Sequence, residues 1–262
     1  MIGVFDSGVG GLTALKELCA RMPHEDYIYL ADSAHLPYGS LLHSDITRHT
    51  ARACSFLREK GADCVLLACG TASATALGFC RRSFPIPIYD VLEPSVLAAK
   101  RITKSHRIGV AATEATVKSG AVTRLFNIYD PMCEPICVPC PSLVQLIEAS
   151  KDESAVCYEA VRASFAPLRD AKVDTVILGC THFAWLRPYI TAFLPNVELI
   201  ESGKEGAIAL CDTLLGCAPK QTPPSCGTLS LYTTASQKEL SERAEGALQR
   251  KVKVKTISKD II

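Results

Sequence analysis

The sequence lacks an excess of charge of either sign. Its 262 residues include 28 Lys and Arg against 27 Asp and Glu, which gives a net charge of +1. Proteins that bind nucleic acid or anionic surfaces attract them with a strong basic field. The charge balance therefore argues against nucleic acid, a membrane or an acidic polymer as a partner. The hydrophobic fraction of 48% and the charged fraction of 21% are ordinary for a folded globular protein.

A long apolar segment and a secretory leader are also absent from the sequence. The longest uncharged run, residues 64–80, is interrupted by glycine and hydroxyl residues. These interruptions favour a buried strand followed by a helix over a membrane span. No basic segment precedes Asp6, so no signal peptide is expected. We therefore predict a cytoplasmic protein.

Cysteine, in contrast, is abundant. The 13 cysteines are scattered between Cys19 and Cys226, and their odd number does not suit a short, disulfide-rich secreted scaffold. Most lie in apolar segments, where cysteine behaves as a small buried hydrophobic residue. A chemically active cysteine has to be identified by its surroundings.

Short apolar segments alternate with helical patterns, which is typical of a parallel α/β fold. A helix is expected over Ser236–Lys251, a loop over Ala218–Cys226, and an edge strand whose solvent face carries Lys251, Lys253 and Lys255. Strands are predicted at Ile2–Phe5, Tyr27–Ala31, Cys64–Ala68, Arg107–Ala111, Glu134–Val138, Thr175–Gly179, Val197–Ile200, Leu229–Thr233 and Val252–Thr256.

A weak internal repeat indicates two related halves. Residues 63–69 align without a gap with residues 174–180, and each segment is an apolar strand that ends in a cysteine, Cys69 or Cys180. A repeat this short can also arise by chance, because buried parallel strands use few residue types. We interpret it as structural symmetry between two domains that face each other.

The segment Asp6–Gly11 lies between a predicted strand and a predicted helix. Its glycines allow a sharp turn that exposes backbone N–H groups, which suits an anion. The segment does not match a dinucleotide fingerprint, because Thr13 stands where the third glycine belongs. A small carboxylate fits as well as a phosphate, and a simple capped turn is the alternative.

Cys69 and Cys180 are the strongest candidates for chemistry. A thiol at a helix N-terminus or beside a cationic group becomes a useful base or nucleophile. Taken alone, each cysteine is best interpreted as an unreactive residue of the hydrophobic core. The repeat and the neighbouring Thr71, Thr181 and His182 favour an active pair instead.

The spacing of Cys133, Cys137 and Cys140 is also that of an iron–sulfur cluster. Two prolines and a strand-like alternation argue against a cluster there, and we predict no metal site. The segment Pro37–Gly39 is predicted to form a rigid turn with exposed N–H groups.

Together these segments resemble the glutamate racemases of the cofactor-independent aspartate/glutamate racemase superfamily, over nearly the whole chain. The matching segments are Gly3–Leu12, Ala31–Gly39, Ala68–Ser73, Leu92–Pro94, Gly109–Thr113 with Thr116, Cys140–Val144 with Glu148, Leu178–His182 and Glu201–Gly203. The resemblance implies two pseudo-symmetric, doubly wound α/β domains with parallel sheets and the active site in the cleft between them. One domain is expected to comprise residues 1–94 with a returning segment 205–262, and the other residues 95–204.

The resemblance also implies an enzyme that interconverts L- and D-glutamate and supplies D-glutamate to bacterial peptidoglycan. Cys180 would deprotonate the L form and Cys69 the D form, with Asp6 assisting Cys69, His182 assisting Cys180, and Glu148 near the second site. No metal, pyridoxal phosphate or nucleotide is required. The residues expected to bind the substrate are Ser7, Pro37, Tyr38, Gly39, Gly70, Thr71, Thr113, Thr116 and Thr181.

Gly70 is the main departure from the family pattern, which has Asn after the first catalytic cysteine. Losing the charge-assisted hydrogen bonds of that Asn would cost about 1.5–3 kcal/mol, and glycine leaves room that water could fill. Two alternatives follow: a racemase of another small acidic amino acid such as aspartate, and a racemase-like binding or regulatory protein with weakened catalysis. The family often forms homodimers, but the sequence identifies no pairing surface.

Overall fold

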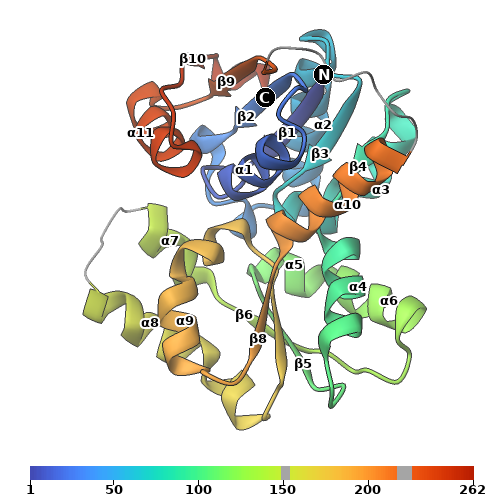
Figure 1. Cartoon of the computed structure of the whole chain (residues 1–262), viewed down its shortest axis with the longest axis vertical. Helices are drawn as coiled ribbons and strands as arrows, with labels where there is room; N and C mark the ends of the chain where they lie inside the picture. Colours follow the sequence, from blue (N-terminus) through green and yellow to red (C-terminus); the bar gives the residue numbers. More distant parts are fainter. Residues whose placement is uncertain (149–153, 217–225) are drawn as a thin grey trace.

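The chain folds around two parallel β-sheets, each covered by helices on both faces. The structure is a computed structural model and describes residues 1–148, 154–216 and 226–262. Figure 1 shows the first sheet in the upper part of the molecule and the second sheet in the lower part. The mixed α/β fold with two parallel sheets confirms the predicted fold class.

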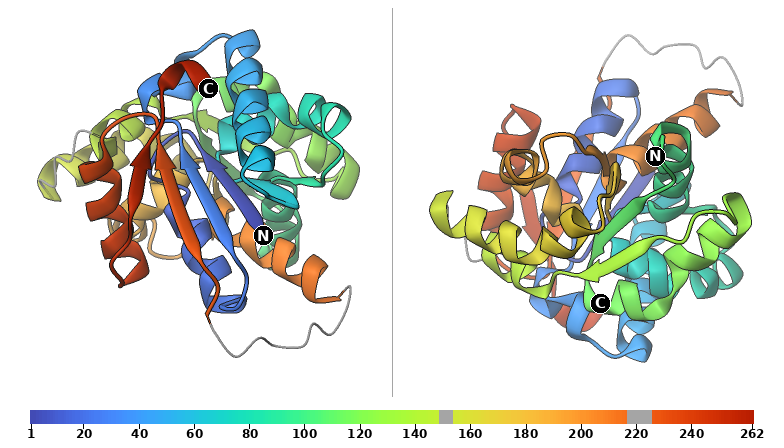
Figure 2. Two further views of the ribbon diagram at one scale, coloured as in Figure 1. Left: turned by 90° about the horizontal axis from the view of Figure 1, so that it is seen from above. Right: turned by 90° about the horizontal axis from the view of Figure 1, so that it is seen from below.

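The first sheet has six strands in the order β10-β9-β2-β1-β3-β4. Its strands are β1 (Ile2–Asp6), β2 (Tyr27–Ala31), β3 (Cys64–Leu67), β4 (Ile88–Tyr89), β9 (Leu229–Thr233) and β10 (Val254–Thr256). Strands β9 and β10 come from the end of the chain, and Figure 2 shows them continuing the sheet beside β2. The late segment therefore completes the sheet that the first residues begin.

The second sheet has four strands in the order β6-β5-β7-β8. Its strands are β5 (Ile108–Ala112), β6 (Ile136–Pro139), β7 (Thr175–Leu178) and β8 (Glu198–Glu201). Its order repeats that of β2-β1-β3-β4 in the first sheet, so β1 corresponds to β5 and β3 to β7. The two segments of the sequence repeat are the equivalent strands β3 and β7.

Helices connect successive strands and pack on both faces of each sheet. They are α1 (Leu12–Arg21), α2 (His43–Glu59), α3 (Gly70–Ser83), α4 (Leu92–Ile102), α5 (Glu114–Ser119), α6 (Ala121–Tyr129), α7 (Pro141–Glu148), α8 (Ser154–Asp170), α9 (Arg187–Phe193), α10 (Ser202–Gly216) and α11 (Gln237–Leu248). Short 3-10 helices are η1 (Ser33–His35), η2 (Tyr38–Ser40), η3 (Thr181–Leu186) and η4 (Lys259–Ile261).

Alternation along the buried strands explains why each sheet has two hydrophobic cores. In β1, Ile2 and Val4 pack with residues of α1, α10 and α11, whereas Phe5 packs with residues of α2 and α3. In the second sheet, α7, α8 and α9 contribute to one core and α4 and α6 to the other. Successive side chains of a strand point to opposite faces, so strands covered on both sides are apolar throughout.

The predicted strands all correspond to observed strands, with end shifts of a few residues. The prediction missed β4, because Ile88–Tyr89 is too short to show a period and follows Pro87. The predicted C-terminal helix is α11, and Lys255 lies exposed on the edge strand β10 as expected. Lys251 and Lys253 are also exposed, but they precede β10 instead of lying on it. The predicted loop Ala218–Cys226 lies almost entirely outside the described residues.

No helix in the described ranges is both long and apolar enough to cross a bilayer. A cytoplasmic location stays a prediction.

Candidate active site

The candidate residues lie where the strands of both sheets end. Asp6 is the last residue of β1, Cys69 and Cys180 come two residues after β3 and β7, and Thr113 follows β5 directly. The carboxyl ends of the strands of a parallel sheet are where such folds bind their ligands. Because the two sheets are equivalent, each delivers a cysteine from the same position.

These strand ends surround one cavity with an empty volume of about 540 Å³, which includes its open mouth. It is lined by Ser7, Leu36, Pro37, Tyr38, Gly39, Ser40, Cys69, Thr71, Thr113, Glu114, Pro141, Val144, Gln145, Cys180, Thr181 and His182. A pocket of this size, with apolar walls and a few polar groups, suits a small molecule.

The Cys69 sulfur lies 3.3 Å from the Ser7 hydroxyl, and the cysteine is 4% exposed. Burial and the nearby charge of Asp6 raise the pKa of the Cys69 thiol to about 12, although the contact with Ser7 works in the opposite direction. Cys69 therefore carries its proton at neutral pH and can act as an acid.

The Cys180 sulfur lies 3.5 Å from Nδ1 of His182, whose Nε2 contacts the Glu148 carboxylate. Burial of His182 disfavours its charged form, but the charge of Cys180 and the bonds to Cys180 and Glu148 together raise the pKa of His182 well above its usual value. An imidazolium beside a cysteine is a partner that activates the sulfur as a base.

Asp6 is fully buried and bridges the loop after β1 to the second sheet. Its carboxylate accepts a 3.0 Å bond from the Gly8 N–H and a 3.1 Å bond from the Thr181 hydroxyl. Burial raises the pKa of Asp6, while the charge of His182 and these hydrogen bonds act against that rise. Cys69 shares its side-chain hydrogen bond with Ser7 and not with Asp6, so the predicted assistance of Cys69 by Asp6 stays a prediction.

A chain of threonine hydroxyls links the segment after β3 in the first sheet to the segment after β5 in the second. Oγ1 of Thr71 and Oγ1 of Thr113 are 2.8 Å apart, and Oγ1 of Thr116 lies 2.9 Å from that of Thr113. Thr71 is the second residue of α3, the helix after Cys69, whereas Thr113 caps the helix after β5. The hydroxyls that face the cavity are thus held in place by one another.

The turn Pro37–Gly39 forms a further wall of the cavity. The peptide bond between Leu36 and Pro37 is cis, and the Tyr38 hydroxyl donates a 2.6 Å bond to the buried Asp32. Thr234, which follows β9, donates to the same carboxylate at 2.8 Å. The turn is therefore anchored to the segment that returns from the end of the chain.

The structure brings most of the predicted site residues together. Ten of them line the cavity: Ser7, Pro37, Tyr38, Gly39, Cys69, Thr71, Thr113, Cys180, Thr181 and His182. The other four are next to lining residues: Asp6, Thr116 and Glu148 are hydrogen-bonded to Thr181, Thr113 and His182, and Gly70 stands between Cys69 and Thr71 in the chain.

The sequence analysis missed six residues of the cavity wall: Leu36, Ser40, Glu114, Pro141, Val144 and Gln145. A signal for three of them existed in the sequence. Pro141, Val144 and Gln145 are three and four residues apart on α7, so they share one helix face, next to the already identified Cys140.

One expectation about Gly70 is wrong. We expected glycine at this position to leave room beside the first cysteine, for water or for a different substrate. A Cβ built on Gly70 would lie only 2.0 Å from the carbonyl oxygen of Gly179. The backbone of the other half therefore occupies the space that a side chain would fill.

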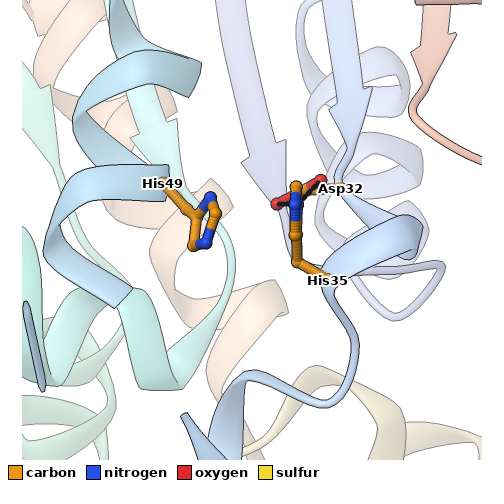
Figure 3. Close-up of side chains that lie close together, drawn as sticks. All are labelled: Asp32, His35 and His49. Carbon is orange, nitrogen blue, oxygen red and sulfur yellow. Dashed lines mark hydrogen bonds and ion pairs between the residues drawn. The ribbon is translucent and has the colours of Figure 1, made fainter. Parts of the chain in front are cut away.

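Outside the cavity, the side chains of Asp32, His35 and His49 lie close together (Figure 3). Their ligand-type atoms are within 4.8 Å of one another. The two imidazole rings stack, with centroids 4.0 Å apart and planes at 28°. The lone pairs of stacked rings run side by side and do not converge on one point. Nδ1 of His35 lies 2.9 Å from the Asp32 carboxylate, which also accepts from Tyr38. We interpret the cluster as the anchor of Tyr38.

The cysteines with cluster-like spacing do not form a comparable group. In the described ranges, the Asp32 group is the one set of three or more such residues with ligand atoms this close. The Cys133 thiol contacts the carbonyl of His106, and the Cys140 thiol contacts that of Val138. The alternative of an iron–sulfur cluster is therefore not supported.

The comparisons with known proteins agree with this geometry. Residues 2–210 match the family model described as Asp/Glu/Hydantoin racemase. A glutamate racemase from Aquifex aeolicus is 37% identical over 257 residues, which cover 98% of this chain and 97% of that protein.

Two solved structures are similar over nearly their full length. A glutamate racemase isoform from Bacillus anthracis has a TM-score of 0.93 and 30% identity, covering 98% of this chain and 97% of that one. A Francisella tularensis glutamate racemase in complex with D-glutamate has a TM-score of 0.89 and 28% identity, covering 100% and 98%. The chain belongs to the Asp/Glu/Hydantoin racemase family.

Proposed function

We propose that this protein is a glutamate racemase that interconverts L- and D-glutamate without a cofactor and supplies D-glutamate for bacterial peptidoglycan. The observation that carries the proposal is that Cys69 and Cys180, at the ends of equivalent strands in two sheets, line the same cavity. Inversion of a carbon centre needs a base on one face and an acid on the other. Two cysteines from opposite sides of a cleft meet that requirement.

Glutamate as the substrate is supported by the relatives. The Aquifex aeolicus protein, similar over nearly the whole chain, is a glutamate racemase, and the Francisella tularensis structure holds D-glutamate. The cavity offers hydroxyl groups of Ser7, Thr71 and Thr181, which are suited to the carboxylate and amino groups of a small amino acid.

In the L-to-D direction, the Cys180 thiolate removes the α-proton and becomes a thiol. The Cys69 thiol then delivers its proton to the opposite face of the carbanion and becomes a thiolate. The D-to-L direction uses the same two groups with their roles exchanged. His182 stabilises the Cys180 thiolate, and Glu148 holds the imidazolium in place.

The remaining predicted residues bind or position the substrate in this proposal. The wall is formed by Ser7, Pro37, Tyr38, Gly39, Thr71, Thr113 and Thr181. Thr116 is hydrogen-bonded to Thr113, and Gly70 follows Cys69 in the chain. Asp6 supports Thr181 and lies close enough to influence the charge states of both Cys69 and His182.

We further propose that residues 1–94 with 205–262 form one half and residues 95–204 the other. This division is supported by the sheets, since β1–β4, β9 and β10 fall in the first half and β5–β8 in the second. Helices α4 and α10 cross the two boundaries. A homodimer stays a prediction without an assigned surface.

The two alternatives are not favoured. The aspartate alternative depended on extra room at Gly70, and the Gly179 carbonyl fills that space. The binding-protein alternative would be expected to lose catalytic groups, whereas Cys69, Cys180, Asp6 and His182 are all present.

The proposal is tested by proton NMR of the protein with L-glutamate in deuterated water, followed by chiral analysis of the same sample. We expect the α-proton signal to disappear and D-glutamate to accumulate until the two enantiomers are equal. Exchange with L-aspartate but not with L-glutamate would move the assignment to the other substrate. If neither acid exchanged its α-proton, the family assignment would stand, but the proposed racemase activity would be wrong.

A further inference from the structure

The side chain of Arg243 reaches from the first sheet's helices to those of the second sheet. Arg243 lies on α11, whose Leu240 and Ala244 are buried in a core shared with α1 and β1. Its Nη2 donates a 3.0 Å hydrogen bond to the main-chain oxygen of Ile147 on α7, which packs on the second sheet. The returning end of the chain therefore contacts the helix that carries Glu148.

The same guanidinium lies over the ring of Trp185, with its central carbon 5.7 Å from the ring centroid. At this separation a cation is attracted by the π-electrons of the ring. Among the residues with described positions, Nε1 of Trp185 is the one buried side-chain nitrogen or oxygen without a hydrogen-bond partner. The ring is therefore held by packing alone, and Arg243 forms part of that packing.

The two elements that Arg243 contacts carry the two groups that support the second cysteine. Ile147 directly precedes Glu148 on α7, and η3 holds both His182 and Trp185. The side chains of Glu148 and His182 contact each other. Arg243 thus joins the two elements whose side chains form this contact.

The bond from Arg243 restrains the backbone next to Glu148. A hydrogen bond with a charged donor is stronger than one between neutral groups, and its acceptor here is the main chain one residue before Glu148. The carboxylate stands at the end of a long, rotatable side chain, so its position depends on where the backbone lies. A restraint on that backbone favours the conformation in which the carboxylate meets the imidazole of His182.

We propose that Arg243 is a positioning residue that holds α7 against η3 so that Glu148 supports His182. The inference rests on the proposed racemase function and adds to it a residue from the returning segment. Arg243 is not among the residues that line the cavity, so it acts through these two side chains. Without the guanidinium, the carboxylate is less often in contact with the imidazolium, and the Cys180 thiolate loses part of its support.

This role predicts an unequal effect on the two directions of turnover. Arg243→Met removes the guanidinium and keeps an unbranched side chain. Because His182 serves Cys180, which removes the proton of L-glutamate, we expect kcat for L-glutamate to fall about tenfold and kcat for D-glutamate to fall less. A partly unfolded variant would lower both kcat values by the same factor and leave both KM values unchanged.

The pH profile gives a second readout, through the imidazole of His182. Burial disfavours its charged form, whereas the nearby Cys180 after β7, Glu148 on α7 and Asp6 on β1 raise its pKa. Displacement of the Glu148 carboxylate in Arg243→Met lowers that pKa. The alkaline decline in kcat for L-glutamate should therefore begin at a lower pH than in the wild type. A residue that only stabilises the fold would leave the position of this decline unchanged.

The experiment compares the wild type with Arg243→Met, Arg243→Lys and the matched control Lys238→Met. Lys238 lies on the same helix, and its side chain is 86% exposed and pairs with the exposed Glu242 at 3.9 Å, so this control should keep wild-type rates. Lysine retains the charge but lacks the planar group that both stacks on a ring and donates to a carbonyl. Arg243→Lys should therefore fall between Arg243→Met and the wild type.

Two further measurements show how Arg243 acts. Trp185 is the single tryptophan of the chain, so its fluorescence reports the contact without turnover. We expect acrylamide to quench it more readily in Arg243→Met than in the wild type or Lys238→Met. In a Glu148→Ala background, Arg243→Met should change kcat for L-glutamate by less than about twofold, because the contact that it supports is already lost.

An unchanged kcat for L-glutamate in Arg243→Met would overturn the proposal. So would an equal fall in both directions, or the full effect in the Glu148→Ala background. Unfolding of both Arg243→Met and Arg243→Lys would also contradict it, because the side chain would then hold the fold as a whole. An inactive wild type would instead remove the proposed function, and the fluorescence comparison would still test the contact with Trp185.

Discussion

The Thr181 hydroxyl donates a 3.1 Å hydrogen bond to the Asp6 carboxylate, which joins the end of β7 in one sheet to the end of β1 in the other. Both groups are buried, at 4% and 0% exposure. Thr181→Val removes the hydroxyl with little change in shape and leaves one carboxylate lone pair without its donor. We expect a loss of about 1–3 kcal/mol of stability and inversion slowed about tenfold.

Urea unfolding and the chiral assay would measure these two effects. Thr213→Val is the matched control, because Thr213 is exposed and its hydroxyl bonds to a backbone carbonyl within its own helix. Equal effects of the two substitutions would show that the Thr181–Asp6 hydrogen bond contributes no more to stability or to inversion than an exposed one does.

Replacing each cysteine separately should divide the reaction into its two steps. In Cys69→Ala, Cys180 can still exchange the α-proton of L-glutamate, but inversion should fall by about 10²–10⁴-fold. In Cys180→Ala, the remaining exchange should be confined to D-glutamate. Mass spectrometry of each recovered enantiomer measures the deuterium that it has gained. Cys19→Ala, at a half-buried cysteine, is the control. Exchange of both enantiomers in either variant would contradict a base on each face.

Removing His182 should affect one direction of turnover more than the other. His182 contacts Cys180 and Glu148, so His182→Asn should lower kcat for L-glutamate more than kcat for D-glutamate, by about 10² at neutral pH. The ratio kcat/KM must fall equally in both directions, because the equilibrium constant is fixed.

The pH dependence of His182→Asn tests the same assignment. A raised pKa means that the imidazolium, with the stability it contributes, is present at low and neutral pH and is lost as the pH rises through that pKa. The wild type should therefore show an alkaline decline in kcat for L-glutamate that the variant lacks. The same decline in both proteins would assign it to another group.

Buried thiols should make the fold sensitive to alkali. Burial is the first cause that raises the pKa of Cys69 and Cys140 to about 12 and of Cys211 to about 11, from the usual 9.0. The stability they contribute is complete below about pH 9 and is lost as the pH rises toward these folded values. Urea unfolding at a series of pH values should show a progressive loss, with a shallower slope in Cys211→Ala. An unchanged slope would mean that this thiol ionises as readily in the folded as in the unfolded chain.

The hydrogen bond of Tyr38 to Asp32 should stabilise the fold more than a hydrogen bond of a half-exposed tyrosine does. Tyr38→Phe removes the 2.6 Å bond to the buried Asp32, so we expect a loss of about 1–3 kcal/mol in the free energy of unfolding. Tyr129→Phe, which removes a hydroxyl contact with the half-exposed Glu93, should cost less. Equal losses would show that Asp32 finds another donor.

The buried strands were predictable because their composition alone identifies them. Segments such as Tyr27–Ala31 and Cys64–Leu67 are apolar along their whole length, as strands covered on both faces must be. The two-residue strand β4 was not predictable from the sequence. Ile88–Tyr89 pairs with β3 because the tertiary structure places it there.

In the site, too, some features were predictable from the sequence and others were not. Cys69 and Cys180 were identified from their strand ends and their repeat, both of which are local in the sequence. The hydrogen bond from Thr181 to Asp6, across 175 residues, and the contact of Gly70 with Gly179 depend on how the halves meet. No pattern within one segment carries that information. For this reason the sequence led us to expect free space at Gly70, where the structure has none.

The pairing of β2 with β9 also dictates when the first sheet can be completed during synthesis. Tyr27 and Leu229 are register partners in neighbouring parallel strands, so β2 is left with one edge unpaired until the ribosome has made about two hundred further residues. The second sheet, whose four strands lie between Ile108 and Glu201, is available to fold earlier. An unpaired, fully apolar β2 is the kind of edge that invites aggregation. The nascent chain is therefore most in need of a chaperone on its oldest segment, not on its newest.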